Sequence, residues 1–226
     1  MKILLVAATT FEIAPLLDFL RGEGWEREPN HFQKEALSIE VLITGVGLPL
    51  AAFALGHRLA TRKYNLLVQA GVAGAIDRNL ELGDVVEVVS DCFADLGVEE
   101  ADGAFTPVTT MDLIDGDVFP FKEGRLWNTS DDRPAFLPKV HGISVNTVHG
   151  TEESIMKMKT NFPFGQVESM EGAAFFYASL QYGTPALQIR AISNYVEKRQ
   201  RERWKLKEAI ENLNKVLQEM LLSFSG

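Results

Sequence analysis

The chain has 226 residues, of which 46% are hydrophobic, and its formal net charge at pH 7 is −9. This length and hydrophobic content suffice to bury a full core, so we expect one domain over residues 1–226. The acidic balance disfavours binding to a nucleic-acid backbone, which depends on clustered lysine and arginine.

Apolar strand-like runs alternate with helical patterns along the chain. The predicted strands cover residues 2–8, 39–44, 65–70, 84–90, 141–147 and 186–193, and the predicted helices cover residues 12–21, 49–63, 151–161, 169–182 and 202–224. Several strands lack polar alternation, which is typical of strands buried on both faces. The order favours an α/β fold with a central, mostly parallel mixed sheet flanked by helices.

Residues 91–140 interrupt this alternation as an irregular insertion. It contains Gly, Pro and Asp together with six scattered aromatic residues: Phe93, Phe105, Phe119, Phe121, Trp127 and Phe136. A long irregular insertion in a compact domain usually closes over a ligand or makes a subunit contact. Ordinary packing explains its aromatic residues equally well.

No apolar run reaches the roughly 18 residues that a membrane span needs. The apolar start of the chain is short and Glu12 follows it, so it predicts a first buried strand. We therefore expect a soluble, cytoplasmic protein without a membrane partner. Cys92 is the one cysteine; it cannot form an intramolecular disulfide, and we interpret it as a buried or half-buried packing residue.

Polar and glycine-rich positions follow the predicted strands. Glu12 follows the first strand and residues 45–47 follow the second. Residues 71–74 follow the third, and Asn194 follows the last. Ligands of open α/β sheets bind outside the carboxyl ends of the strands, so these positions predict a site there. Singly, each has a structural explanation: capping for Glu12 and Glu171, and turn chemistry for Asn194.

Metal and cofactor motifs are not found in the sequence. His141 and His149 stand without the carboxylate or histidine spacing of a metal site. Residues 45–47 lack the third glycine of a dinucleotide fingerprint and the lysine of a P-loop. We expect neither a metal nor a cofactor, and we interpret the basic cluster at residues 198–203 as a solvated helix start.

Five motifs occur together in a fixed order. They are Thr-Phe-Glu at 10–12, Thr-Gly-Val-Gly at 44–47, Ala-Gly-Val-Ala-Gly at 70–74, Val-Glu-Ser-Met-Glu-Gly at 167–172 and Arg-Ala-Ile-Ser-Asn at 190–194. The joint pattern resembles the nucleoside phosphorylase and nucleosidase superfamily, specifically its methylthioadenosine/S-adenosylhomocysteine nucleosidase branch. The resemblance covers nearly the whole chain and is weakest across the insertion. It implies a phosphorylase/hydrolase-like fold, a small-molecule nucleoside substrate, and a homodimer with the insertion near its interface.

The resemblance also implies the roles of the site residues. Glu12 orients the attacking water, Glu171 holds the ribose hydroxyls, and Asn194 contacts the departing base. Val148 stacks on the purine, and the backbone at His149 contacts the edge of the base. The expected substrate-binding positions are Val72, Ala73, Gly74, Val148, His149, Met170 and Ser193.

Phosphorolytic members of the superfamily differ from this chain at two phosphate-binding places. They carry a Gly-Asp-Pro-x-Arg loop and an Arg before the third glycine motif, where this chain has residues 8–12 and Gln69. Gln69 and Val72 supply no charge-assisted donor to a phosphate dianion. Water is therefore the expected nucleophile.

Asn194 stands where adenine-specific nucleosidases carry Asp. A 6-aminopurine protonated at N7 offers two donors, which match a carboxylate, whereas a 6-oxopurine offers one donor and one acceptor, which match an amide. A mismatch costs about 1–3 kcal/mol, enough to select the base. Hypoxanthine is therefore the favoured leaving group.

Residues 190–197 look like the corresponding segment of the futalosine hydrolases, which act on a 6-oxopurine nucleoside with a bulky 5′ substituent in a route to menaquinone. This implies hydrolysis of futalosine with release of hypoxanthine. Three alternatives stay open: a methylthioadenosine/S-adenosylhomocysteine-type nucleosidase that tolerates Asn194, an inosine phosphorylase, and a non-catalytic nucleoside-binding module. Glu12 and Glu171 together argue against the last, because binding alone needs no water-directed carboxylate.

Overall fold

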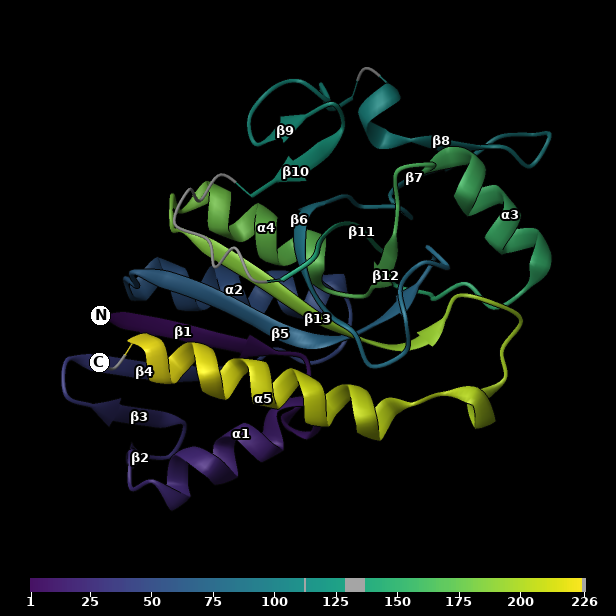
Figure 1. Cartoon of the computed structure of the whole chain (residues 1–226). Helices are drawn as coiled ribbons and strands as arrows, with labels where there is room; N and C mark the ends of the chain where they lie inside the picture. Colours follow the sequence, from purple (N-terminus) through teal and green to yellow (C-terminus); the bar gives the residue numbers. More distant parts are fainter. Residues whose placement is uncertain (112, 129–136, 225–226) are drawn as a thin grey trace.

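The computed structural model describes residues 1–111, 113–128 and 137–224, and the fold is described for these residues. A mixed sheet of eleven strands lies between two layers of helices (Figure 1). Its elements, in chain order, are β1 (Lys2–Ala7), α1 (Thr10–Gly22), β2 (Glu26–Glu28), β3 (His31–Lys34), β4 (Leu37–Ile43), α2 (Leu48–Thr61), β5 (Leu66–Ala75), β6 (Val85–Asp91), β7 (Gly97–Glu99), β8 (Phe105–Pro107), β9 (Phe121–Lys122), β10 (Arg125–Trp127), β11 (Lys139–Ser144), α3 (Glu152–Asn161), β12 (Val167–Ser169), α4 (Gly172–Gln181), β13 (Ala186–Tyr195) and α5 (Leu206–Phe224), with single 3-10 turns at Val108–Thr110 and Arg201–Arg203.

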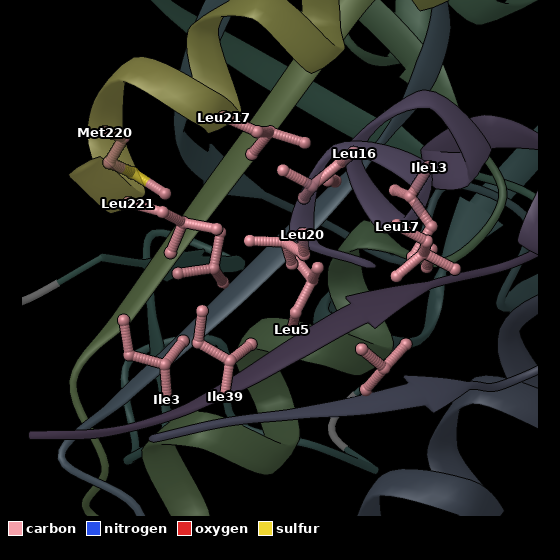
Figure 2. Close-up of a cluster of buried hydrophobic side chains, with 14 of the residues drawn as sticks. Ile3, Leu5, Ile13, Leu16, Leu17, Leu20, Ile39, Leu217, Met220 and Leu221 are labelled. Atoms are coloured by element: carbon pink, nitrogen blue, oxygen red, sulfur yellow. The ribbon is translucent and has the colours of Figure 1, made fainter. Parts of the chain in front are cut away.

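Strand β1 is buried on both faces because its side chains point alternately to two hydrophobic clusters. Ile3 and Leu5 pack with α1 and α5 on one face, in the cluster that Figure 2 shows. Leu4 and Val6 pack with α2 and α4 on the other face. Each leucine buried this completely contributes about 1.5–3 kcal/mol of transfer free energy. The prediction of strands buried on both faces is confirmed.

Strands β5, β12, β11, β6 and β13 close into a ring, because β13 pairs with both β5 and β6. Leu187, Ile189 and Ala191 of β13 face the helices α1 and α5. The alternate residues, Gln188 and Arg190, therefore point to the opposite side of the strand, where Gln188 meets Asp91 of β6. The ring thus encloses a buried polar network.

The predicted α/β class with a central mixed sheet is confirmed. Parallel pairings join β1 to β4 and β5, β13 to β5, and β11 to β6 and β12. The ring also contains antiparallel pairs, β12 with β5 and β13 with β6. The polar hairpin β2–β3 extends the sheet by pairing with β4 and was not predicted from the sequence.

Four predicted positions were wrong. Asn194 does not follow the last strand but lies within β13, because Asn194 and Tyr195 continue the pairing with β5. Residues 71–74 do not follow the third strand but lie within β5, because β13 pairs with β5 over nearly its whole length. The helix expected from residue 169 begins at Gly172, because residues 167–169 pair with β5 and β11 as β12. The closing helix begins at Leu206 rather than residue 202, since a 3-10 turn occupies residues 201–203.

The insertion at residues 91–140 forms the hairpins β7–β8 and β9–β10, and β10 continues the sheet by pairing with β6. Phe93 and Phe121 pack against the α2–α4 cluster, whereas Phe119 is exposed; Phe136 lies outside the described residues. Cys92 is buried, as predicted. Within the part of the chain that the structure describes, no helix combines the length and apolar character needed to cross a membrane.

Candidate active site

A cavity of about 340 Å³ opens where strands β1, β5 and β13 end, between the starts of α1 and α4. This volume lies within the range of small-molecule sites, roughly 300–1,000 Å³. Nine of the ten predicted site residues line it, namely Glu12, Val72, Ala73, Gly74, Val148, Met170, Glu171, Ser193 and Asn194. The tenth, His149, lines an adjoining recess of about 60 Å³ that shares Gly74, Glu168 and Asn194 with the cavity.

Glu12 is fixed at the start of α1 by three donors. Its Oε2 accepts hydrogen bonds from the Thr9 backbone N–H at 2.9 Å and the Thr9 hydroxyl at 3.1 Å. Its Oε1 accepts the N–H of Val72 at 3.2 Å. The capping interpretation of Glu12 therefore holds, and the same contacts hold the buried carboxylate against the cavity.

Glu171 joins three parts of the site. Its Oε1 accepts the backbone N–H of Gly47, just before α2, at 3.0 Å, and its Oε2 lies 3.7 Å from Nη1 of Arg190. Burial raises the pKa of Glu171, while the Arg190 charge and the Gly47 N–H act in the opposite direction. The Thr-Gly-Val-Gly motif at residues 44–47 thus supplies a backbone donor to this carboxylate.

Gly71 brings Arg190 and Glu12 together. A β-carbon at Gly71 would lie 2.5 Å from Nη1 of Arg190 and 2.8 Å from Oε1 of Glu12. Both distances are shorter than any normal contact of a side-chain carbon, so a larger residue at this position would displace one or both side chains. Arg190 therefore approaches both carboxylates, and its Nη1 forms an ion pair with Glu171 at 3.7 Å.

Asp91 is linked to Arg190 by hydrogen bonds through Gln188. Nε of Arg190 donates to Oε1 of Gln188 at 3.2 Å, and Nε2 of Gln188 donates to Oδ2 of Asp91 at 3.3 Å. The Ser144 hydroxyl donates to Oδ1 of Asp91 and accepts the N–H of Ala173 in the first turn of α4. Burial raises the pKa of Asp91 to about 6, although Ser144, Arg190 and Gln188 oppose the rise.

The amide of Asn194 has a fixed orientation. Nδ2 donates to the carbonyl of Tyr195 at 2.9 Å, and Oδ1 accepts the Ser193 hydroxyl at 2.8 Å. Because a backbone carbonyl only accepts, the atom that faces Tyr195 is the amide nitrogen. One N–H and one oxygen lone pair remain available toward the cavity. Gly74 leaves room for them, since a β-carbon there would lie 3.1 Å from Nδ2.

Sequence reasoning missed Arg190, Glu168 and Arg199 as residues of this site. Arg190 stands in the apolar segment Leu187–Ile192, and an unexplained charge inside an apolar strand is the signal that could have found it. Arg199 belongs to the basic cluster at 198–203, which is mostly exposed, as predicted; Arg199 also lines the cavity beside Trp204. Across the described ranges, no group of three or more His, Cys, Asp or Glu side chains is placed to hold a metal ion.

Comparison with known proteins gives the relatives of this chain. A family model described as Phosphorylase superfamily matches residues 137–223. A futalosine hydrolase from Streptomyces coelicolor is 32% identical over 76% of this chain and 73% of the relative, and one from Acidothermus cellulolyticus is 30% identical over 94% and 87%. A solved structure of a futalosine hydrolase mutant from Helicobacter pylori strain 26695 shares the fold, with a TM-score of 0.79 at 16% identity over 99% of each chain.

The fold, the carboxylate-lined cavity and these relatives define an N-glycosyl hydrolase of the phosphorylase superfamily that acts on nucleosides. At 30–32% identity over at least 73% of the relatives' length, the match is more specific than the superfamily. The chain belongs to the futalosine hydrolase family.

Proposed function

We propose that this enzyme hydrolyses the N-glycosidic bond of futalosine, releases hypoxanthine, and serves menaquinone biosynthesis in the cytoplasm. The orientation of the Asn194 amide is the observation that supports hypoxanthine as the released base. The remaining N–H matches O6 of a 6-oxopurine, and the remaining oxygen lone pair matches a proton on N7. The futalosine hydrolases from Streptomyces coelicolor and Acidothermus cellulolyticus, to which the chain is similar, support the same substrate.

Glu12 is the general base of the proposed reaction. Three donors hold its carboxylate at the cavity wall, so it can direct a water molecule at the anomeric carbon without reorganising. Glu171 accepts the ribose hydroxyls and favours the cationic sugar of an oxocarbenium-like transition state. Val148 and Met170 line the cavity as apolar contacts to the purine and the ribose respectively.

Arg190 does not convert the site into a phosphate site. Its Nε is bonded to Gln188, and its Nη1 lies beside Glu171 and close to Oε1 of Glu12. A phosphate dianion beside two carboxylates and one arginine would meet a net negative field. Gln69, which stands where phosphorolytic members of the superfamily carry Arg, is buried within β5 and does not line the cavity. Water remains the nucleophile of the proposal.

A homodimer is part of the proposal. Phe53, Leu50 and Val46 of the α2 region are 78%, 54% and 49% exposed. Phe11, which is also exposed, and Val46 line the cavity, so this apolar surface continues into the site. Association of two chains through it would cover the surface and the cavity mouth together. Sedimentation equilibrium should give twice the mass of one chain; a monomer at micromolar concentration would contradict this part.

The main competitor is an enzyme for methylthioadenosine-type substrates, and the Asn194→Asp variant separates the two. A carboxylate oxygen in place of Nδ2 would face the carbonyl of Tyr195, which repels it, and would offer the base acceptors only. We expect the ratio of kcat/KM for a 6-oxopurine over the matching 6-aminopurine nucleoside to fall at least about tenfold. An unchanged ratio, or a wild type that prefers the 6-aminopurine, would refute the proposed base.

A further inference from the structure

Glu168 is a buried carboxylate at the wall of the cavity, and the mechanism above does not use it. It lies in the middle of β12, where it pairs in register with Gly74 of β5. Asn194 of β13 pairs with the same Gly74 from the other side. Neighbouring strands are about 4.8 Å apart, so Glu168 and Asn194 flank Gly74 on two sides. Both side chains line the cavity and its adjoining recess.

His149 holds the Glu168 carboxylate in place. The backbone N–H of His149 donates to Oε1 at 3.2 Å and to Oε2 at 3.4 Å, and Nδ1 of the ring is bonded to Oε2. Because a carboxylate only accepts, Nδ1 carries the proton in this pair. The Glu168 side chain is only 3% exposed, so these bonds stabilise a charge that is otherwise expensive to bury.

The hydrogen bonds between His149 and Glu168 change which hydrogen-bonding group the cavity wall presents to a purine base. A free N–H of His149 would be a donor, which suits the N1 lone pair of a 6-aminopurine. Here that N–H is directed to Glu168, and the wall presents a carboxylate acceptor instead. Oε2 receives both the ring Nδ1–H and the 3.4 Å backbone contact, whereas Oε1 receives the 3.2 Å backbone contact alone. Oε1 therefore retains the greater capacity to accept another hydrogen bond.

We infer that Glu168, positioned by His149, selects the base by accepting the N1–H of a 6-oxopurine. A 6-aminopurine has no proton on N1, so its lone pair would face the carboxylate and be repelled. Glu168 thus acts on the N1 edge, and Asn194 on the O6 and N7 edge, of the same ring. The inference rests on the proposed function, because it takes a 6-oxopurine nucleoside as the substrate.

The Glu168→Gln variant tests the inference with a directional result. In this variant the single amide oxygen at position 168 accepts hydrogen bonds from the two His149 donors. The NH₂ group is then left to face N1 of the base. The ratio of kcat/KM for a 6-oxopurine nucleoside over its 6-amino counterpart with the same 5′ group should fall about tenfold to a hundredfold. Glu153→Gln, an exposed carboxylate on α3 that pairs with Lys157, should leave the ratio unchanged.

Binding of free bases to the wild-type enzyme gives a second test that needs no variant. Competitive inhibition by hypoxanthine should be at least about tenfold tighter than inhibition by 1-methylhypoxanthine, which lacks the N1 proton. Equal inhibition by the two bases, or an unchanged nucleoside ratio in a folded Glu168→Gln variant, would overturn the role of Glu168. A wild type that releases adenine in preference to hypoxanthine would instead overturn the proposed function itself.

Discussion

Replacing Gly71 with Ala should damage catalysis much more than folding. The new β-carbon would lie 2.5 Å from Nη1 of Arg190 and 2.8 Å from Oε1 of Glu12. Ordinary contact needs about 3.4 Å or more, so one or both groups must move by roughly 0.6–0.9 Å. A misplacement of about 1 Å at catalytic groups costs on the order of 100-fold in rate, whereas overpacking costs about 1–3 kcal/mol of unfolding free energy.

The assay is base release measured by chromatography together with urea unfolding of the same preparations. Gly56→Ala is the matched control, because a β-carbon at Gly56 in α2 meets no atom within 4 Å. Alanine is favoured over glycine in a helix by about 0.5–1 kcal/mol, so this variant should be fully active and slightly more stable. A Gly71→Ala enzyme within twofold of the wild-type kcat would refute the placement of Arg190 and Glu12 around Gly71.

Two further predictions concern buried carboxylates. Glu12→Gln should lower kcat about 100- to 10,000-fold while nucleoside binding, followed by calorimetry, persists; near-wild-type turnover would exclude Glu12 as the base. Asp91 has a pKa of about 6 when folded and an ordinary value of 3.8, so the folded state binds more protons between those values. Its contribution to unfolding free energy should therefore fall by about 2 kcal/mol as pH rises from 4 to 7. Asp91→Asn should lose that fall in denaturation curves, and an identical pH slope in both proteins would contradict the burial argument.

Strong local patterns predicted most of the fold. The apolar alternation of strand and helix gave β1, β4, β5, β6, β11 and β13 and the helices that cover them, within a few residues at most ends. Short strands such as β12 exist because of partners distant in sequence, so local periodicity does not predict them. The hairpin β2–β3 is polar and mostly exposed, and it carries no periodic signal.

The site was predicted in part because its motifs lie at, or just after, the ends of strands that meet at one edge of the sheet. The partners of those motifs could not be predicted. Arg190 lies beside Glu171 because β13 pairs with β6 and closes the ring of strands. Glu168 is bonded to His149 because of the register in which β12 pairs with β5. These contacts depend on strand order and register, which the sequence pattern alone leaves undetermined. The predicted contact of the His149 backbone with the base must compete with its hydrogen bonds to Glu168.

The most direct test of the account is base release by the wild-type enzyme from futalosine, aminofutalosine, inosine and methylthioadenosine, each with and without phosphate. We expect hypoxanthine release from futalosine at a rate that phosphate does not change. Release that requires phosphate would contradict the hydrolytic site around Glu12 and Arg190. Preferred release of adenine from methylthioadenosine would contradict the base selection assigned to Asn194.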